Sequence, residues 1–417
     1  MTWLQRYRAS SFVRSSVWLP PVVGMLAALL LQRLIQRADL ALGWQSSVGP
    51  DGARAVLGAL ASSMLTFIVF VFSILLVAVQ LASAQLTPRI IALVYRNRVI
   101  KLSLTVFVYT FTYTLAVLSD IEESVPQISQ WLAVYSNLFC IALFIYMIDH
   151  VGKSLRPISL LLRIGNIGQQ VLKEVYPRSV SGTDDSPTNE GPRPHVEPSR
   201  DMASLRTGTV LAFDVAGTLR IARRTDCVVE LVPHVGDFVT RGDLLFHVYG
   251  GGDAITDHQL HHLVAIGPER TLEQDPEFAF RVIVDIACKA LSPAINDPTT
   301  AVLALDQIHR LMRTVVTREL DTGRVLDDAG RLRLMYRTPG WEDFVNLSFT
   351  EIRLYGRESI QVVRRMRAVL EDLMTIAPPQ RVALLREELE LLSRGIARDF
   401  RDPEDQVRAA SPDPLGV

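Results

Sequence analysis

Three histidines in the segment DHQLHH, residues 257–262, have a spacing that suits metal binding. On a helix, the i, i+3 and i+4 positions of His258, His261 and His262 share one face, and imidazole nitrogens on one face can bind Zn²⁺. The segment has no companion such as an HExxH motif, and histidines are common in the polar first turns of surface helices. We therefore expect solvated histidines, no metal site and no cofactor.

The segment ALSPAINDPTTA, residues 290–301, places polar groups where a ligand could meet them. Pro293 is expected to end one helix, and Asp297, which precedes Pro298, is expected to cap the next. Hydroxyl groups at a helix N-terminus can also bind an anion or lie in a subunit interface. The candidate residues for such a site are Asn296, Asp297, Thr299 and Thr300. A structural corner between two helices explains the residue types better, and both interpretations stay open.

Motifs for other chemistry are missing from the sequence. It has no nucleotide-binding glycine loop, no GxSxG motif and no cluster of acid and base residues. The three cysteines, Cys140, Cys227 and Cys288, are far apart, which argues against a thiolate zinc site or a disulfide framework. The net charge of −1 gives no basic field for nucleic acid. The sequence therefore indicates no enzyme class and no nucleic-acid partner.

Long apolar stretches near the N-terminus predict a membrane protein. A helix that crosses a bilayer needs about 20 mostly apolar residues. Stretches of this length occur at residues 17–36, 56–83, 102–119 and 128–148. We expect these four helices to form a transmembrane domain, residues 17–152, with the lipid bilayer as partner. The first stretch lacks a small-residue cleavage site and is interpreted as an anchor, not a signal peptide.

Basic residues between the predicted spans indicate the orientation, because Lys and Arg are enriched in cytoplasmic loops. One side carries Arg6, Arg8, Arg14, Arg89, Arg96, Arg98, Lys101, Lys153, Arg156 and Arg163. The other side carries two loops. One mixes Arg37 and Arg54 with Asp39 and Asp51, and the other, DIEESVPQ, has no basic residue. We therefore expect both termini to lie in the cytoplasm, including an N-terminal segment of residues 1–16.

Several segments together resemble one family of bacterial proteins. They are QLTPRIIALVYRNR, DFVTRGDLLFHV, ERTLEQDPEFAFRVIVDIACKALSPAINDPTTAV and WEDFVNLSFTEIRLYG. The chain resembles, from about residue 15 to about 395, the predicted membrane protein family filed as domain of unknown function 2254. The resemblance implies a multi-pass bacterial membrane protein with a cytoplasmic C-terminal region, and we therefore expect it in the inner membrane. It implies no activity and supplies no catalytic residues.

The remaining chain is expected to form a cytoplasmic α+β region. We predict a juxtamembrane helix at 153–176, a disordered linker at 177–203, a β module at 204–250, a helical domain at 254–400 and a disordered tail at 401–417. The β module would use the strands TGTVLAFD, GTLRIA, CVVELV and DLLFHVY. Its VGDFV and RGDLL turns resemble those of biotinyl/lipoyl-type barrel-sandwich modules. The fold class is thus a four-helix membrane protein with a small barrel-sandwich-like module followed by helices.

Two functions fit this organisation. The middles of the spans carry no Asp, Glu or Lys, which disfavours an ion-coupled pump. Candidate pore-lining residues are Ser62, Ser63, Thr66, Ser73, Thr105, Tyr109, Thr112 and Asn137. The first hypothesis is a homo-oligomeric channel-like or transport-related protein, gated or regulated by its cytoplasmic domain, with an unknown ion or small-molecule ligand. The second is a membrane-anchored sensing or interaction scaffold without transport. The number of hydroxyl and aromatic residues in the spans favours the first slightly.

Overall fold

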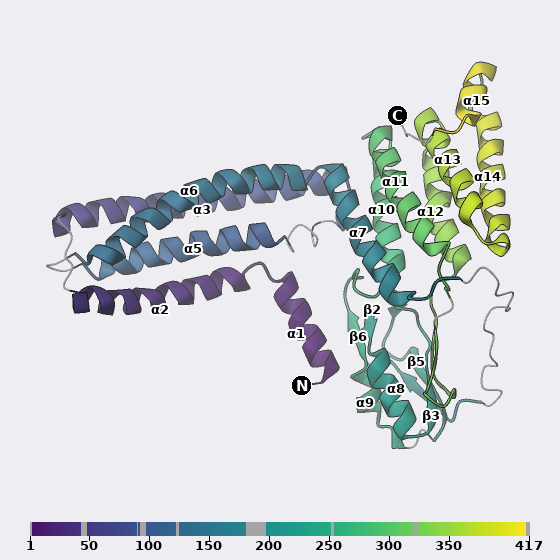
Figure 1. Ribbon diagram of the computed structural model, residues 1–417, viewed down its shortest axis with the longest axis horizontal. Helices are drawn as coiled ribbons and strands as arrows, with labels where there is room; N and C mark the ends of the chain where they lie inside the picture. Colours follow the sequence, from purple (N-terminus) through teal and green to yellow (C-terminus); the bar gives the residue numbers. More distant parts are fainter. Residues whose placement is uncertain are drawn as a thin grey trace. The chain divides into compact units, whose positions relative to one another are not determined.

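A computed structural model describes residues 2–42, 48–89, 91, 97–121, 125–180, 197–251, 254–320 and 323–413 (Figure 1). The chain divides into two compact units. Residues 10–159 form the first, which we call the membrane unit. Residues 1–9 and 160–417 form the second, which we call the α/β unit. Each unit is described by itself below.

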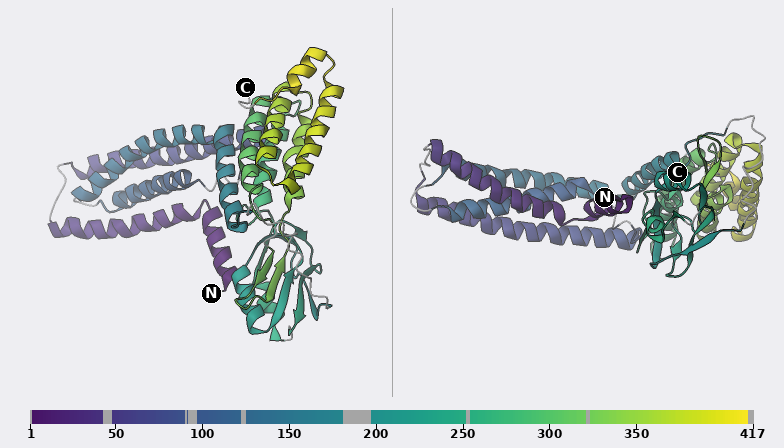
Figure 2. Two further views of the ribbon diagram at one scale, coloured as in Figure 1. Left: turned by 45° about the vertical axis from the view of Figure 1, so that its right-hand side comes forward. Right: turned by 90° about the horizontal axis from the view of Figure 1, so that it is seen from below.

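The membrane unit consists of long apolar helices that run alongside one another (Figures 1 and 2). They are α2 (Leu19–Leu42), α3 (Pro50–Gln85), α5 (Arg98–Ser119) and α6 (Gln127–Ser154). Each of these four helices, within the described ranges, is long and apolar enough to cross a membrane. The four predicted spans are therefore confirmed as helices of spanning length.

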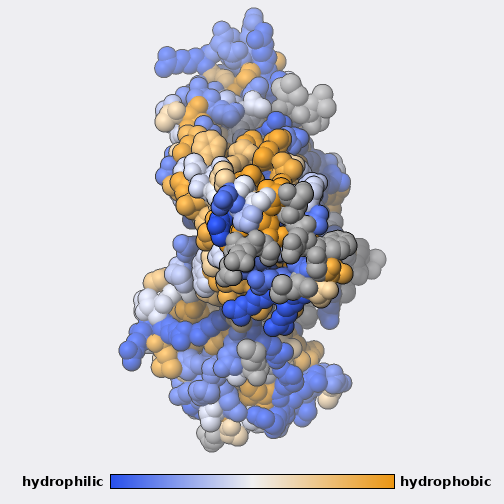
Figure 3. Space-filling view, turned by 90° about the vertical axis from the view of Figure 1, so that its left-hand side faces the viewer, coloured by the Kyte–Doolittle hydropathy of each residue, from blue (hydrophilic) through white to orange (hydrophobic). Residues whose placement is uncertain are grey.

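Helix α5 forms much of the interior of this bundle. Its side chains Leu104, Phe107 and Tyr113 are fully buried and belong to two hydrophobic clusters shared with the other helices. The outer faces of α3 and α6 instead expose large apolar side chains, such as Phe70 and Ile145. Apolar residues also gather where the bundle faces the viewer in Figure 3. Such exposed apolar area is expected where lipid, and not water, surrounds a protein.

One acidic residue of α2 organises an end of the bundle, which sequence patterns did not reveal. The carboxylate of Asp39 accepts hydrogen bonds from the backbone nitrogens of Ile128 and Ser129, at 2.9 and 3.1 Å. The hydroxyl of Ser129 donates a third, at 2.8 Å. The first amides of α6 lack partners within their own helix, so Asp39 acts as a cap supplied by another helix.

The α/β unit contains two β-sheets. The first has the strand order β1-β5-β3-β8-β7 and the second the order β4-β2-β6. The strands are β1 (Arg200–Ala203), β2 (Gly208–Phe213), β3 (Cys227–Leu231), β4 (Phe238–Val239), β5 (Leu244–Gly250), β6 (Val264–Gly267), β7 (Arg324–Leu326) and β8 (Leu332–Tyr336). Strand β8 pairs with β3 in parallel, and the other pairs are antiparallel. The sheets thus extend beyond the predicted range 204–250 and draw on strands from within the predicted helical domain.

The segment GTLRIA was wrongly predicted as a strand, because it lies in helix α8 (Val215–Arg224). The side chain of Asp214 accepts a hydrogen bond from the backbone nitrogen of Gly217 at 2.9 Å and so caps this helix. Thr218 and Ala222, four residues apart, are fully buried on one face. This helical spacing places one face of α8 against the core. The burial of that face stabilises a helix in spite of the preference of the β-branched residues for a strand.

Helices form the other part of the α/β unit, and the sheets lie at one end of them (Figures 1 and 2). They are α7 (Pro157–Val175), α10 (Pro276–Ala290), α11 (Pro298–Val315), α12 (Trp341–Tyr355), α13 (Ile360–Ile376), α14 (Pro379–Asp399) and α15 (Pro403–Ala410). Helix α15 contradicts the predicted disordered tail. Asp402 caps it by accepting a hydrogen bond from the nitrogen of Glu404 at 2.8 Å. Of the predicted linker 177–203, residues 181–196 lie outside the described residues, and residues 200–203 form β1.

Two further helices, α1 and α9, belong to the described part of the chain. Most of the N-terminal segment 1–16, for which no secondary structure was predicted, forms helix α1 (Trp3–Ser15). Its residue Leu4 is buried against Ala212 and Ala265 of strands β2 and β6. Helix α9 (Asp257–His261) begins at the cap residue Thr256. The start of the chain therefore belongs to the α/β unit, while the end of α1 leads into the first membrane helix.

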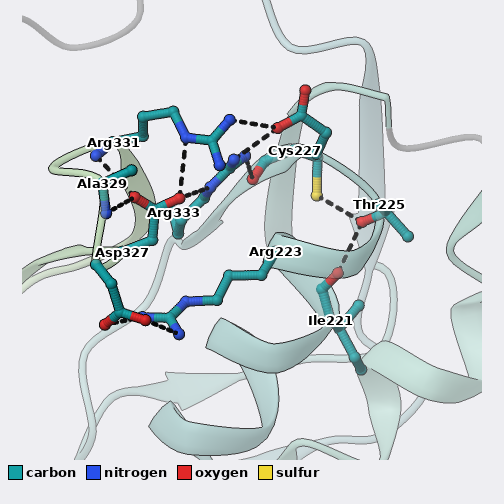
Figure 4. A network of polar contacts seen from close by, with 10 residues as sticks. Ile221, Arg223, Thr225, Cys227, Asp327, Ala329, Arg331 and Arg333 are labelled. Carbon is teal, nitrogen blue, oxygen red and sulfur yellow. Dashed lines mark hydrogen bonds and ion pairs between the residues drawn. The ribbon is translucent and has the colours of Figure 1, made fainter.

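A network of charged side chains holds the β7–β8 hairpin against the start of β3 (Figure 4). Arg333, on β8, is almost fully buried. Its guanidinium donates to Asp327 at 2.9 Å and to Asp226 at 2.6 Å. Arg223 of α8 binds Asp328 through two hydrogen bonds of 2.9 and 3.0 Å. These hydrogen bonds connect the hairpin to the segments on either side of it. Removing one acidic partner leaves the buried Arg333 with less compensating negative charge.

Replacing Asp327 by asparagine is expected to lower the unfolding temperature at neutral pH. The hydrogen bond from Arg333 holds the pKa of Asp327 well below its ordinary value of about 4. The carboxylate therefore contributes stability above about pH 4, and this contribution is lost as the pH falls towards its lower native pKa. Thermal unfolding should show a gap of several degrees at neutral pH that closes in acid. An equal gap at every pH would contradict this account.

Candidate functional site

Helix α7 connects the last membrane helix to the α/β unit. It begins at Pro157, two residues after Leu155, which is the C-cap of α6. The apolar face of α7 is buried. Gly165 and Gly168 let α7 approach α10 and α11 closely. A Cβ atom at Gly168 would lie 2.8 Å from Ala279 Cβ of α10 and 3.3 Å from Leu311 Cδ2 of α11. Such contacts are too short for a methyl group, so α7 lies directly on α10 and α11.

Tyr176, the residue after α7, is fully buried next to a group of ionisable side chains. Its hydroxyl donates a hydrogen bond to the carbonyl of Pro339 at 3.0 Å. We call this group the carboxylate cluster. It consists of His234, Asp237, Arg270, Asp275, Glu277, Arg337 and Asp343, whose charges act on one another or on Tyr176. The cluster thus combines the turn before β4, the segment that leads from β6 into the first turn of α10, and the segment that leads from β8 into the first turn of α12.

Arg270 and Asp275 form a doubly hydrogen-bonded ion pair in the carboxylate cluster. Two hydrogen bonds, of 2.7 and 2.9 Å, join the guanidinium to the carboxylate, which also caps α10 at the nitrogen of Phe278. The turn at Gly236 packs against this pair, because a Cβ there would lie 2.6 Å from both side chains. Gly236 also has a positive φ of 106°, which favours glycine. Burial nevertheless raises the pKa of Asp275, against the effect of Arg270.

Glu277 is a member of the carboxylate cluster whose negative charge is only weakly compensated. Its nearest cation is Arg270, whose Nη2 is 3.8 Å from Glu277 Oε2 and which already binds Asp275. Burial, and then the neighbouring charge of Asp275, raise the pKa of Glu277 from 4.5 to about 7. This carboxyl group therefore gains or loses its proton near neutral pH.

His234 and Tyr176 respond to the same surroundings. Burial, followed by the positive charge of Arg337, lowers the pKa of His234, while burial and then Glu277 raise the pKa of Tyr176. A neutral Tyr176 next to a titrating Glu277 places a proton-dependent charge at the end of α7. The arrangement can bind and release a proton near neutral pH.

The predicted corner at residues 290–301 has the helix ends expected from the sequence. Asp297 caps α11: its carboxylate accepts hydrogen bonds from the nitrogen and the hydroxyl of Thr300, at 3.1 and 2.5 Å. Asn296 has a positive φ of 49°, which asparagine tolerates, and its side chain is exposed. Thr299 is also exposed. The cap uses the groups of Asp297 and Thr300, so Asn296 and Thr299 are the two candidates that face outwards.

A protein-family model described as "Predicted membrane protein (DUF2254)" matches residues 14–372. The chain belongs to the DUF2254 family. An uncharacterised protein of Mycobacterium bovis, Mb1321c, and one of Mycobacterium tuberculosis, Rv1290c, are each 27% identical over 417 residues. Each alignment covers 95% of this chain and 79% of the relative. No solved structure matches the chain significantly.

The histidines of this DUF2254 protein form a pair and not a metal-binding triad. The Nε2 atoms of His258 and His262 lie 3.0 Å apart. In the part of the chain that the structure describes, no group of three or more His, Cys, Asp or Glu side chains could hold a metal ion. His261 is half-buried, and burial lowers its pKa.

The hydroxyl residues of the DUF2254 membrane unit occupy two different positions. Ser62, Ser63, Thr66 and Ser73 are exposed on α3. The hydroxyls of Thr66 and Ser73 donate to carbonyls four residues earlier, at 3.1 and 2.9 Å. On the inner helices, Thr105 and Thr112 bond in the same way to their own helix, at 2.7 and 2.9 Å.

Tyr109 and Asn137, the other two pore candidates, contact neighbouring side chains inside the bundle. Tyr109 stacks on Tyr113 of the same helix, with ring centroids 5.9 Å apart. Asn137 of α6 donates to Thr114 Oγ1 of α5 at 3.0 Å. These contacts serve helix packing, so the outward hydroxyls of α3 are the candidates that another subunit could meet.

Proposed function

We propose that this predicted membrane protein is a proton-responsive sensing protein of the bacterial inner membrane. In this proposal the α/β unit lies in the cytoplasm, and protonation of the carboxylate cluster changes how α7 packs. The membrane unit then responds because α7 follows directly on the last membrane helix. The cytoplasmic placement is supported by the basic residues next to the ends of the spans on that side, such as Arg14, Lys101 and Lys153.

One observation carries the proposal: α7, which follows the last membrane helix, ends at Val175, and the next residue, Tyr176, is buried beside the carboxylate cluster. Glu277 there has its pKa near 7 and acts on Tyr176. Along its length, α7 packs so closely at Gly168 that it cannot shift without disturbing α10 and α11. A passive anchor would need only a flexible connection, whereas a packed helix transmits a change at one end to the other.

The alternative is the oligomeric channel-like or transport-related protein. The observation that favours it is the exposed set Ser62, Ser63, Thr66 and Ser73 on α3, which would line a path only if several copies assembled around it. The inner hydroxyls described above bond within the bundle, so a single copy offers little lining for a pore. We therefore place the sensing function first.

Amide hydrogen exchange of the full-length protein in liposomes tests the sensing function. After correction for the intrinsic pH dependence, residues 160–175 of α7 should exchange differently at about pH 5 and about pH 9. The same difference should vanish in a Glu277→Gln variant. Equal protection of wild-type α7 at both pH values would refute the proposal. Ion or solute flux through these liposomes that is lost on substituting Ser62 and Thr66 by leucine would instead establish the channel.

A further inference from the structure

One edge of the Arg310 guanidinium, on α11, is buried without a hydrogen-bond partner. Among the residues that the structure describes, neither its Nε nor its Nη2 atom has an acceptor. These two nitrogens lie on the same edge of the guanidinium and can donate in parallel to two oxygens of a carboxylate or a phosphate. Arg270 uses the same pair of nitrogens to bind Asp275, at 2.7 and 2.9 Å. Arg310 therefore carries this donor pair without an acceptor from the described protein.

The acidic residue of α11 does not compensate the charge of Arg310. Asp306 lies four residues earlier, a spacing at which an acid and an arginine can pair on a helix. Its carboxylate instead accepts a hydrogen bond from Arg365 Nε of α13, at 2.7 Å. Burial lowers the pKa of Arg310, but arginine stays charged in proteins. The buried edge therefore costs free energy that a bound anion would offset.

Gln307, three residues before Arg310 on the same helix, brings a second unpartnered group to the same place. Its side chain is 6% exposed, and its Oε1 atom has no hydrogen-bond donor within the described part of the chain. A Cβ atom at Gly165 of α7 would lie 2.5 Å from Arg310 Nη2 and 2.8 Å from Gln307 Oε1. Both atoms therefore lie against the same point of the α7 backbone.

These two groups define the chemistry of a matching ligand. Two negatively charged oxygens would accept hydrogen bonds from the guanidinium edge, and an adjacent hydroxyl would donate to Gln307 Oε1. Inorganic phosphate and phosphate monoesters have both features, because they keep a hydroxyl on phosphorus when they are singly charged. Sulfate has the charged oxygens and lacks the hydroxyl. The pair of side chains therefore matches a protonated phosphate better than a sulfate.

Helix α7 covers this pair of side chains. Because the α7 backbone at Gly165 lies directly on Arg310 and Gln307, a phosphate can reach them only when this part of α7 moves away from α11. A ligand that binds only the displaced form increases the population of that form. Helix α7 follows the last membrane helix, α6, in the chain. A ligand at this place would therefore act on the helix that connects the two units.

We propose that Arg310 and Gln307 form a phosphate-binding site beneath Gly165 of α7, and that a phosphate with a free hydroxyl displaces α7 from α11 when it binds there. The phosphate can belong to a free molecule or to a lipid headgroup, because both offer the same group. The site is independent of the proton response proposed above, since neither residue belongs to the carboxylate cluster.

Amide hydrogen exchange at one pH tests this site in the full-length protein. In phosphatidylcholine nanodiscs at about pH 7 and constant ionic strength, inorganic phosphate should speed the exchange of residues 160–170 several-fold. Sulfate should have a much smaller effect, and it controls for the general stabilisation that both anions cause. In a second preparation without free phosphate, phosphatidic acid replaces part of the phosphatidylcholine. Faster exchange there would show that a lipid supplies the phosphate.

Substitutions at the site provide the matched comparison. Arg310→Leu should abolish the response to phosphate, and it should fold because an apolar residue in place of a buried unpaired charge is often neutral or stabilising. Arg310→Lys, which lacks the paired donors, should respond more weakly than wild type and serves if the leucine variant does not fold. Arg394→Leu, at an exposed position on α14, should respond as wild type does. The proposal is overturned if neither source of phosphate changes the exchange, if sulfate acts as strongly as phosphate, or if Arg310→Leu keeps the full response.

Discussion

Replacing Glu277 by glutamine is expected to stabilise the protein by about 2–3 kcal/mol above about pH 8 and to leave its stability unchanged near pH 4. Burial and the nearby charge of Asp275 raise the pKa of Glu277 to about 7, so the folded protein binds this proton more tightly than the unfolded chain does. Stability therefore falls as the pH rises from about 4.5 to about 7, and the full cost is present above that range. Glutamine removes this cost because it has no charge to bury.

Chemical unfolding of the full-length protein in detergent, followed by tryptophan fluorescence at several pH values, measures this effect. Glu390→Gln, at an exposed position on α14, is the control and should change stability little at any pH. If Glu277→Gln were neutral or destabilising at alkaline pH, the carboxyl group would not be a strained anion in the native protein.

Replacing Gly168 by leucine is expected to destabilise the α/β unit by about 3 kcal/mol or more. The new Cβ would lie 2.8 Å from Ala279 Cβ, which is itself buried on α10, and the rest of the side chain has no room beside Leu311. Helix α7 would have to move away from α10 and α11. Limited proteolysis and thermal unfolding should both report the loss.

The matched control for this substitution is Gly395 of α14. The nearest atom to a Cβ there, Asp399 Oδ2, is 4.0 Å away. Leucine favours the helix over glycine by up to about 1 kcal/mol, so Gly395→Leu should stabilise slightly. Opposite signs of the stability change for the two substitutions would show that the effect of Gly168→Leu arises from the contact of α7 with α10 and α11. Equal signs would mean that α7 does not pack as described.

The sequence was sufficient for features that depend on local patterns. The apolar lengths of the spans predicted helices α2, α3, α5 and α6, and the Asp-Pro pair at Asp297 and Pro298 predicted the cap of α11. These features need only length, composition or near neighbours in the chain. The resemblance to the DUF2254 family was likewise confirmed by the match over residues 14–372.

Features that depend on distant segments could not be predicted. Strand β8 pairs with β3 about a hundred residues earlier, and no local pattern marks that partnership. No local pattern marks Asp39 as a cap, because the helix that it caps begins far along the chain. The raised pKa of Glu277 likewise arises first from burial and then from the charges of Asp275, Asp343 and Asp237, which three separate segments bring together. Burial of a charge becomes visible only when these segments are in place.

The distance between the membrane unit and the α/β unit is the quantity that tests the central claim most directly. Nitroxide labels at Lys153→Cys on α6 and Glu387→Cys on α14, both exposed positions, allow this distance to be measured by pulsed electron resonance in liposomes. We predict different distance distributions at about pH 5 and about pH 9, and in Glu277→Gln a single distribution, that of the acidic form, at both. Identical wild-type distributions at the two pH values would contradict a proton-responsive coupling through α7.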